Sequence, residues 1–471
     1  MHLFIFPVMT PMRIKFAVII FTTFFTTCTF AQSYFSKSFG SAGMACTGKG
    51  VAQAIDNALY YIGNYVNLQT SEHGMELYKL DAAGNIIWRN FIGSQTAHAN
   101  RIIYTAQNKL AIIGQVDDSA GNADAMVLLA DTTGQIIFNK TFGQLASTEM
   151  FSGIAPDKDG GFVLSGFTSN PTGPGNAVYL LRIDSVGNEI WSKIYSYNVN
   201  AVGDDISATS DGNFVFGGDK KTASIDYNAQ VIKIDTSGTI IWNTDITYAF
   251  NSGCKNILET VNGNYLLVGE AATATSAYFD PFITLLDTAG NILWSHIVPC
   301  GNGPEAGYDV IEYLPQQYII TGFGLNQSTG NTDLMIIYLD SNGNETNKQY
   351  FGNSGYDQAF NLILDNSSNS FYAAGMTLVN GEGKYFLIHQ PVLTTSSVVQ
   401  FEKPDITIFP NPTSHILNIS KRGTFKIVNH LGQCLIDTPL QQIDVSSLPN
   451  GCYIIVATIG NQVIRQKFFK I

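Results

Sequence analysis

The residues of this sequence that could do chemistry are carboxylates, because the familiar nucleophile and metal-binding patterns are missing. The 7 histidines show no metal-ligand spacing. The sequence also lacks a P-loop, a nucleophile elbow and a zinc-protease motif. Four aspartates remain as candidate ligand-binding residues: Asp204, Asp205, Asp309 and Asp357. Carboxylates held close together can bind a cation or a hydroxylated ligand, and a matched pair can cleave a glycoside.

Whether these aspartates meet depends on the elements that carry them, and those elements are repeats. All 4 tryptophans end one unit, Asp-x-x-Gly-x-x-x-Trp, with its glycine at Gly84, Gly187, Gly238 and Gly290. Two degenerate copies have Gly134 followed by Phe138, and Gly343 followed by Asn347. Successive glycines are 50 to 53 residues apart. A constant period of this length is typical of a repeat architecture.

A second feature has the same period and extends it to seven copies. An apolar run ends in glycine at Gly63, Gly114, Gly166, Gly218, Gly269, Gly322 and Gly375. In the third copy, turn residues separate four expected strands at 149–156, 161–166, 176–183 and 188–194. Four short antiparallel strands per repeat predict an all-β, seven-bladed β-propeller over residues 32–392.

The two ends of the repeat region complement each other. The seventh copy has a third strand at 383–388 but no fourth strand before Pro391. Residues 34–40 resemble the fourth-strand endings at 139–143 and 348–352. We therefore expect the first strand to complete the last blade, which removes two exposed sheet edges.

In such a propeller the four aspartates lie near the starts of first strands, which line the central channel. This placement predicts a ligand site at the channel mouth, although a hydrated funnel without a ligand accounts for the same residues. The loops at 271–279 and 324–332 are a second candidate surface. We expect non-catalytic binding of a protein or a glycan. The alternatives are a polysaccharide hydrolase or lyase that uses the channel-mouth carboxylates, and a structural spacer.

Several local patterns favour structural roles over chemistry. In each Asp-x-x-Gly unit the aspartate caps a turn, and the aromatic residue is expected to pack between blades. Arg89, Arg101 and Arg182 fall in three kinds of strand, unlike the converging arginines of sialidases. Residues 157–161 lack the distal glutamate of a calcium loop. Quinone-dependent dehydrogenases with a similar repeat have a vicinal Cys-Cys pair, which this sequence lacks. We therefore expect no cofactor and no metal.

The N-terminus has the features of a secretory signal peptide. Arg13 and Lys15 precede an apolar run at 16–25, and a cleavage site follows at Ala31. A lipidation site at Cys28 fits poorly, and no transmembrane segment is expected in the mature chain. The net charge of −12 argues against a nucleic-acid partner.

The C-terminal region differs in composition from the repeats. Residues 393–403 are predicted to be a linker, and residues 404–471 carry 6 Lys and Arg against 3 Asp and Glu. Short expected strands, such as 424–428 and 453–458, predict a small β-sandwich. Export permits disulfides, and the candidate pairs are Cys254–Cys300 and Cys434–Cys452. Unpaired cysteines fit the odd number of cysteines equally well.

The tail resembles a known export signal. Phe409-Pro410-Asn411-Pro412, Leu431-Gly432-Gln433, residues 443–453 and Lys467-Phe468-Phe469-Lys470 are similar to the type A C-terminal sorting domain of the type IX secretion system. Cys452, between Gly451 and Tyr453, is the one departure. The resemblance implies passage through the periplasm, recognition by the type IX machinery at the outer membrane, and release or display at the cell surface.

Overall fold

The computed structural model describes residues 34–393 and 408–471, apart from 119–120, 145–146, 170–174, 196–199, 222–226, 249–250, 273–277, 300–302, 304, 354, 430–432 and 460–461. The described residues form strands and turns. None of them forms a helix that could span a membrane. The expected signal peptide with Ala31, the end of the expected linker, Cys28 and Cys300 lie outside these ranges.

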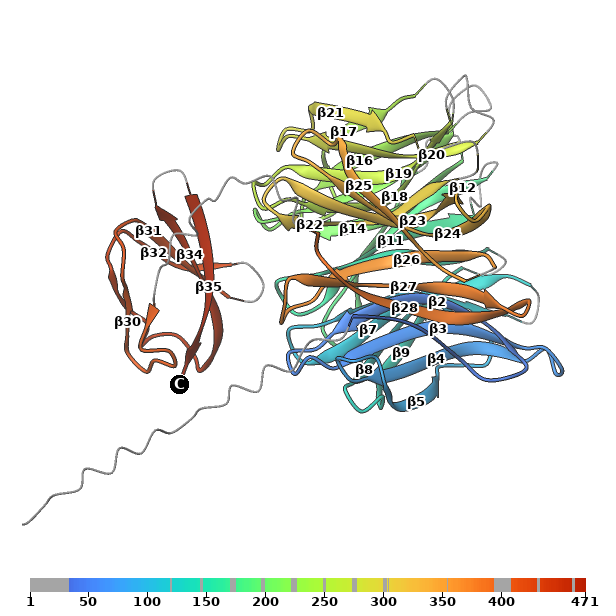
Figure 1. The fold of residues 1–471 in the computed structure, drawn as a ribbon, viewed down its shortest axis with the longest axis horizontal. Helices are drawn as coiled ribbons and strands as arrows, with labels where there is room; N and C mark the ends of the chain where they lie inside the picture. The colour runs from blue at the N-terminus through green and yellow to red at the C-terminus, as the bar shows by residue number, and fades with distance from the viewer. Residues whose placement is uncertain are drawn as a thin grey trace, which may run out of the picture. The chain divides into compact units, whose positions relative to one another are not determined.

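Residues 34–393 form seven four-stranded antiparallel sheets, which confirms the predicted seven-bladed propeller (Figure 1). Blade 1 contains β2 (Met44–Gln53), β3 (Leu59–Asn67), β4 (His73–Leu80) and β5 (Ile86–Ile92). Blade 2 contains β6 (Ala97–Tyr104), β7 (Lys109–Asp117), β8 (Ala123–Asp131) and β9 (Ile136–Phe142). Blade 3 contains β10 (Glu149–Pro156), β11 (Phe162–Ser169), β12 (Asn176–Ile183) and β13 (Glu189–Tyr195). These last four strands lie within a few residues of their predicted positions.

The remaining blades repeat this order. Blade 4 contains β14 (Ala201–Ala208), β15 (Phe214–Lys221), β16 (Tyr227–Ile234) and β17 (Ile240–Ile246). Blade 5 contains β18 (Ser252–Glu259), β19 (Tyr265–Ala272), β20 (Phe279–Leu286) and β21 (Ile292–Ile297). Blade 6 contains β22 (Ala306–Leu314), β23 (Gln317–Asn326), β24 (Asn331–Leu339) and β25 (Glu345–Phe351). Blade 7 contains β26 (Asp357–Leu364), β27 (Ser370–Val379), β28 (Glu382–Pro391) and β1 (Phe35–Phe39).

The first strand of the chain closes the ring, as predicted. β1 pairs antiparallel with β28, from Phe35 opposite His389 to Phe39 opposite Tyr385. The Phe39 ring lies 5.0 Å from the Tyr61 ring of blade 1 and 5.6 Å from the Tyr385 ring of blade 7. In Figure 1 the orange strands of blade 7 accordingly lie beside the blue strands of blade 1. The ends of the propeller segment are therefore joined by both hydrogen bonds and apolar contact.

The aromatic residue of the repeated unit packs against the turn of the next blade. Trp88, Phe138, Trp191, Trp242 and Trp294 each contact the glycine of the following Asp-x-x-Gly turn. Phe35 of β1 makes the same contact with Gly84, so it replaces the tryptophan that blade 7 lacks. Two of the indoles also donate a hydrogen bond to the next blade, Trp191 Nε1 to Thr236 O at 3.0 Å and Trp242 Nε1 to Thr288 O at 3.2 Å.

Gly290 shows why glycine is required in this turn. Its φ is +83°, and a Cβ at this position would lie 2.7 Å from Trp242. Asp287 caps the same turn, because its Oδ1 accepts hydrogen bonds from the backbone N–H groups of Ala289 and Asn291. The repeated unit is therefore a capped turn that receives an aromatic ring from its neighbour, as the sequence predicted.

Residues 408–471 form a small β-sandwich with its own core. One sheet contains β29 (Ile408–Phe409), β30 (Ile416–Ile419) and β33 (Gln442–Asp444). The other contains β31 (Thr424–Val428), β32 (Cys434–Thr438), β34 (Gly451–Ile459) and β35 (Gln462–Lys470). Leu417, Phe425 and Phe468 are among the buried residues between them.

The segments that resemble the sorting domain contact each other in this sandwich. Asn411 Oδ1 accepts a hydrogen bond from Phe469 N at 2.9 Å, and Thr413 N donates to Phe469 O at 2.8 Å. Tyr453 Oη donates to Pro449 O at 2.8 Å. The motif residues thus hold the terminal strand in place. Cys434 and Cys452 are both free thiols, so the disulfide considered for this region does not form.

We expect deletion of residues 32–40 to abolish cooperative unfolding of the propeller, because the deletion leaves blade 7 with three strands and an unpaired β28. Circular dichroism during thermal unfolding would measure this. Phe39→Ala should lower the free energy of unfolding by roughly 2–3 kcal/mol, and Ser38→Ala, at an exposed position of the same strand, should not. An unchanged melting curve after the deletion would contradict the closure.

Candidate functional site

Every first strand of the propeller contains a β-bulge at the same position. The pairing register between first and second strands slips by one residue in all seven blades. The bulged residues are Lys49, Asn100, Ser152, Asp204, Lys255, Tyr308 and Phe360. A bulge redirects side chains, so two consecutive residues of each first strand can face the channel. The bulged residues line one cavity in the channel. The residues that follow them are glycine in two blades, and in the other five blades they line a second cavity.

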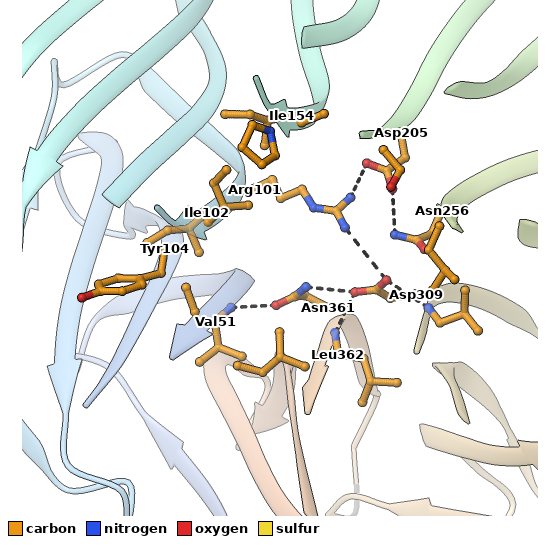
Figure 2. A pocket seen from close by; sticks show the side chains of 18 of the residues that line it. Val51, Arg101, Ile102, Tyr104, Ile154, Asp205, Asn256, Asp309, Asn361 and Leu362 are labelled. Carbon is orange, nitrogen blue, oxygen red and sulfur yellow. Dashed lines mark hydrogen bonds and ion pairs between the residues drawn. The ribbon is translucent and has the colours of Figure 1, made fainter. Parts of the chain in front are cut away.

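The residues that follow the bulges include a polar cluster across the channel axis, which we call the axial cluster: Arg101, Asp205, Asn256, Asp309 and Asn361. Arg101 extends from β6 between two aspartates of more distant blades (Figure 2). Its Nη1 lies 2.6 Å from Asp205 Oδ1, and its Nη2 lies 4.0 Å from Asp309 Oδ1. One guanidinium therefore links blades 2, 4 and 6 through the centre of the ring.

The second oxygen of each aspartate is bonded to the next blade along the ring. Asn256 Nδ2 donates to Asp205 Oδ2 at 2.8 Å, and Asn361 Nδ2 donates to Asp309 Oδ2 at 2.9 Å. Leu362 N also donates to Asp309 Oδ2, at 2.8 Å. Burial raises the pKa of Asp205 to about 6, and Arg101 opposes that shift. Asp205 is therefore mostly ionised at neutral pH, and its charge is compensated inside the cluster.

The axial cluster separates two cavities. On one side, a cavity of about 410 Å³ is lined by an apolar ring that includes Val51, Ile102, Ile154, Ile206, Ile257 and Val310. On the other side, a cavity of about 380 Å³ is lined by all seven bulged residues together with Met150. We call this second cavity the mouth. It opens at the ends of the blades from which the second-to-third-strand loops emerge.

One wall of the mouth is ionic. Lys255 Nζ lies 3.2 Å from Glu270 Oε1, and burial together with the nearby Asp219 raises the pKa of Asp204 well above its usual value. Burial also raises the pKa of Asp219 to about 6. Asp204 Oδ2 has no hydrogen-bond partner among the described residues. Lys255 and Asp204 line the mouth, so this wall offers a ligand one cation and one carboxyl group whose Oδ2 has no partner among the described residues.

The adjoining wall, on blades 6 and 7, is aromatic, and Tyr308 and Phe360 line the mouth there. The Tyr308 ring lies 5.2 Å from the Phe360 ring and 5.8 Å from the Phe323 ring, and Tyr356 lies 5.9 Å from Phe323. Lys49 Nζ lies 5.0 Å from the centre of the Phe360 ring. All four rings are half-buried. An aromatic cluster that stays partly exposed in a concavity is typical of a binding surface.

The four predicted aspartates divide into three environments. Asp204 lies in the mouth, and Asp205 and Asp309 belong to the axial cluster. Asp357 is fully buried at the boundary between blades 6 and 7, where its Oδ2 accepts a hydrogen bond from Asn353 N at 2.9 Å. The structure therefore brings Asp205 and Asp309 together on Arg101 and places Asp357 elsewhere.

Asp357 belongs to a recurring arrangement of buried acids between blades. Asp357 and Asp333 both lie against Gly352, because a Cβ added to this glycine would come within 3.0 Å of an oxygen of each. Asp124 and Glu149 lie in the same way around Gly143. The charge of Asp280 contributes, after burial, to the raised pKa of Glu305. Asp333 Oδ1, Asp357 Oδ1 and Glu149 Oε2 have no hydrogen-bond partner within the described ranges. These acids are features of the blade boundaries rather than of the channel.

The sequence did not indicate the aromatic wall or the two lysines of the mouth. Tyr308, Phe360, Lys49 and Lys255 were not distinguished from other strand residues. Their common property is their position at the bulge of a first strand. Aligning the seven first strands with one another would have exposed this column, because the residue before it is small or apolar in every blade.

Other candidate patterns have structural partners. Arg182 Nε lies 2.6 Å from Asp157 Oδ2 and Nη2 lies 3.1 Å from Asp159 Oδ2, so an arginine neutralises the segment that faintly resembled a calcium loop. Arg89, Arg101 and Arg182 lie on β5, β6 and β12, and each has its own acidic partner.

The identity of the tail follows from its sequence and from the contacts between its motifs. Residues 407–470 match the family of the secretion system C-terminal sorting domain. This is a secreted or cell-surface protein, and its sorting domain implies an interaction with the type IX secretion machinery. The resemblance seen in the motifs is thereby confirmed.

Comparisons of the propeller give only distant similarities. Among curated proteins, none matches the chain. A catalytically inactive virginiamycin B lyase from Staphylococcus aureus is 13% identical, with a TM-score of 0.49 over 76% of this chain and 99% of that chain. The β-propeller domain of the Trilobed protease from Pyrococcus furiosus is 9% identical, with a TM-score of 0.42 over 76% of this chain and 98% of that domain. A Hadza microbial sialidase is 10% identical, with a TM-score of 0.43 over 77% of this chain and 93% of the sialidase chain. At these values they say nothing about the ligand of this chain.

We expect Arg101→Met to destabilise the propeller by roughly 3–5 kcal/mol, because Asp205 and Asp309 are left buried without a cation. Chemical denaturation would measure the loss. Adding Asp205→Asn and Asp309→Asn to this variant should recover most of it, because the buried charges are then removed. A stability of Arg101→Met equal to that of the parent would show that the axial cluster is not a compensated charge site.

The buried acids at blade boundaries predict a dependence of stability on pH. Burial raises the pKa of Glu305 to about 7 and raises that of Asp357. Where the folded-state pKa exceeds the unfolded one, the folded chain holds more protons, so stability falls as the pH rises through that interval. We expect Tm to fall between about pH 5 and pH 8, and Glu305→Gln to lessen the fall. Glu72→Gln, at an exposed position, is the control, and an equal slope in both variants would contradict the assignment.

Proposed function

We propose that this exported propeller is a non-catalytic binding protein that holds a glycan in the mouth. The observation that supports the proposal is an aromatic wall beside an ionic wall in one concavity. The flat rings of Tyr308 and Phe360 present apolar faces on which the C–H face of a sugar ring can pack. Asn100, Ser152, Asp204 and Lys255 on the remaining wall can pair with hydroxyl groups.

The axial cluster favours binding over catalysis. Cleavage of a glycoside needs two carboxylates on either side of a bond, about 5 to 10 Å apart, with access to the substrate. Asp205 and Asp309 are almost fully buried, and each is held by Arg101 and an asparagine. Two of the four carboxylates that the sequence suggested, Asp205 and Asp309, are therefore occupied within the protein. Residues of the mouth remain available to a ligand.

One observation favours a second candidate, a polysaccharide hydrolase or lyase. Asp204 combines a raised pKa with an oxygen that lacks a partner among the described residues, and a general acid requires a carboxyl group that keeps its proton near neutral pH. In this alternative Asp204 protonates the leaving group at the mouth. Asp204→Asn distinguishes the two functions, because it would abolish turnover but leave most of the aromatic contact to a bound glycan.

A glycan array with the secreted protein tests the proposal, followed by titration of any glycan that binds. We expect Phe360→Ala and Tyr308→Ala each to weaken binding by roughly 10-fold, the loss of about 1.4 kcal/mol of contact. Phe91→Ala is the matched control, because Phe91 is an exposed aromatic residue on the outer strand β5.

Three results would contradict the proposal. Capture of proteins in a pull-down without any bound glycan would favour a protein partner. The appearance of shortened products, lost in Asp204→Asn, would favour the enzyme. Binding of neither class would favour a structural spacer, the third function that the sequence allows.

A further inference from the structure

Two histidines and one aspartate meet at the boundary between blades 1 and 2. His73 is the first residue of β4, His98 is the second residue of β6, and Asp117 is the last residue of β7. One donor atom from each residue lies within 4.8 Å of the other two. His98 Nε2 and Asp117 Oδ2 lie 3.2 Å apart. These residues come from separate strands of two repeats, which explains why sequence spacing does not indicate the cluster.

The surroundings orient two of the three side chains toward a common point. Gln115 Nε2 donates to Asp117 Oδ1 at 2.8 Å, which leaves Asp117 Oδ2 directed at His98. His73 Nδ1 lies 3.3 Å from Ser71 O. A carbonyl oxygen can only accept, so Nδ1 carries the proton and the lone pair of His73 is at Nε2. Hydrogen bonds of this kind are typical of the partners that hold metal ligands in position.

An ion pair between His98 and Asp117 would account for two of these residues but not for the third. The His73 and His98 rings are stacked, with centroids 5.1 Å apart and an angle of 16° between the planes. The stacking brings a nitrogen of each ring to the Asp117 carboxylate, so three donor atoms from separate strands converge. A divalent cation would use all three as ligands.

We propose that His73, His98 and Asp117 form a binding site for a divalent first-row transition metal, with zinc as the ion that fits best. Two imidazole nitrogens and one carboxylate oxygen are a common zinc ligand set, and calcium or magnesium would prefer oxygen alone. Small rotations of the two stacked rings would direct both nitrogens at one ion. All three side chains are half-buried, so a fourth coordination position remains open to water.

The position of the cluster gives the metal a structural consequence. His73 belongs to blade 1, and the other two ligands belong to blade 2. Zinc would therefore join neighbouring blades at the end of the propeller where the second-to-third-strand loops emerge, and its binding would stabilise the folded ring. This inference does not rest on the proposed glycan function.

Isothermal titration of the metal-free full-length protein with zinc tests the site. We expect one zinc ion to bind at this site and to raise Tm. His73→Ala and His98→Ala should each weaken zinc binding by roughly 10-fold or more and remove the rise in Tm. His296→Ala is the matched control, because His296 is a half-buried histidine of blade 5 that lies beside Trp294.

Asp117→Asn provides a milder variant if an alanine substitution prevents folding, since it keeps the shape of the side chain and removes its charge. Zinc binding with parental affinity in His73→Ala and His98→Ala would overturn the proposal and point to another site, such as the exposed thiol of Cys434. No binding to the parent, or an equal loss in His296→Ala, would overturn it as well. Loss of binding in the cluster variants alone supports it.

Discussion

The structure depends on one packing contact, an aromatic ring laid on the glycine turn of the next blade. A four-stranded sheet buries its faces only against neighbours, so the blades are stable as a ring and not singly. Trp242 on Gly290 is one of six such contacts, and each sets the distance between two blades. Phe35 makes the equivalent contact on Gly84 from the opposite end of the chain. Ring closure and blade spacing are thus two results of the same interaction.

The bulge in each first strand combines a constant backbone geometry with a variable side chain. Because the bulge recurs in all seven blades, its backbone geometry is part of the fold. The side chains that it presents differ from blade to blade, and these differences produce the axial cluster and the mouth. Arg101 bridges Asp205 and Asp309 across the channel, whereas blades 1 and 3 have Gly50 and Gly153 at the equivalent position. Sites of recognition can vary in this way without a change in the packing between blades.

The repeats made the fold predictable, and the site was predictable only in part. A period of about 52 residues, turn residues and complementary ends were enough to predict seven blades and the closing strand. Asp205 and Asp309 were correctly assigned to channel-lining strands, but nothing in one sequence shows that Arg101 reaches both across the ring. Asp357 is also near the start of a first strand, but it lies three residues before the bulge and is buried at the boundary between blades 6 and 7. His73 and His98 meet through a contact between repeats, which local spacing does not encode.

Hydrogen–deuterium exchange of the secreted protein, with and without a bound glycan, tests the central claim that the mouth is the functional surface. The account predicts slower exchange around the bulges of β14, β18, β22 and β26, which carry Asp204, Lys255, Tyr308 and Phe360. Exchange at the Asp-x-x-Gly turns, on the opposite ends of the blades, should not change. Protection confined to those turns or to the outer fourth strands would contradict the account.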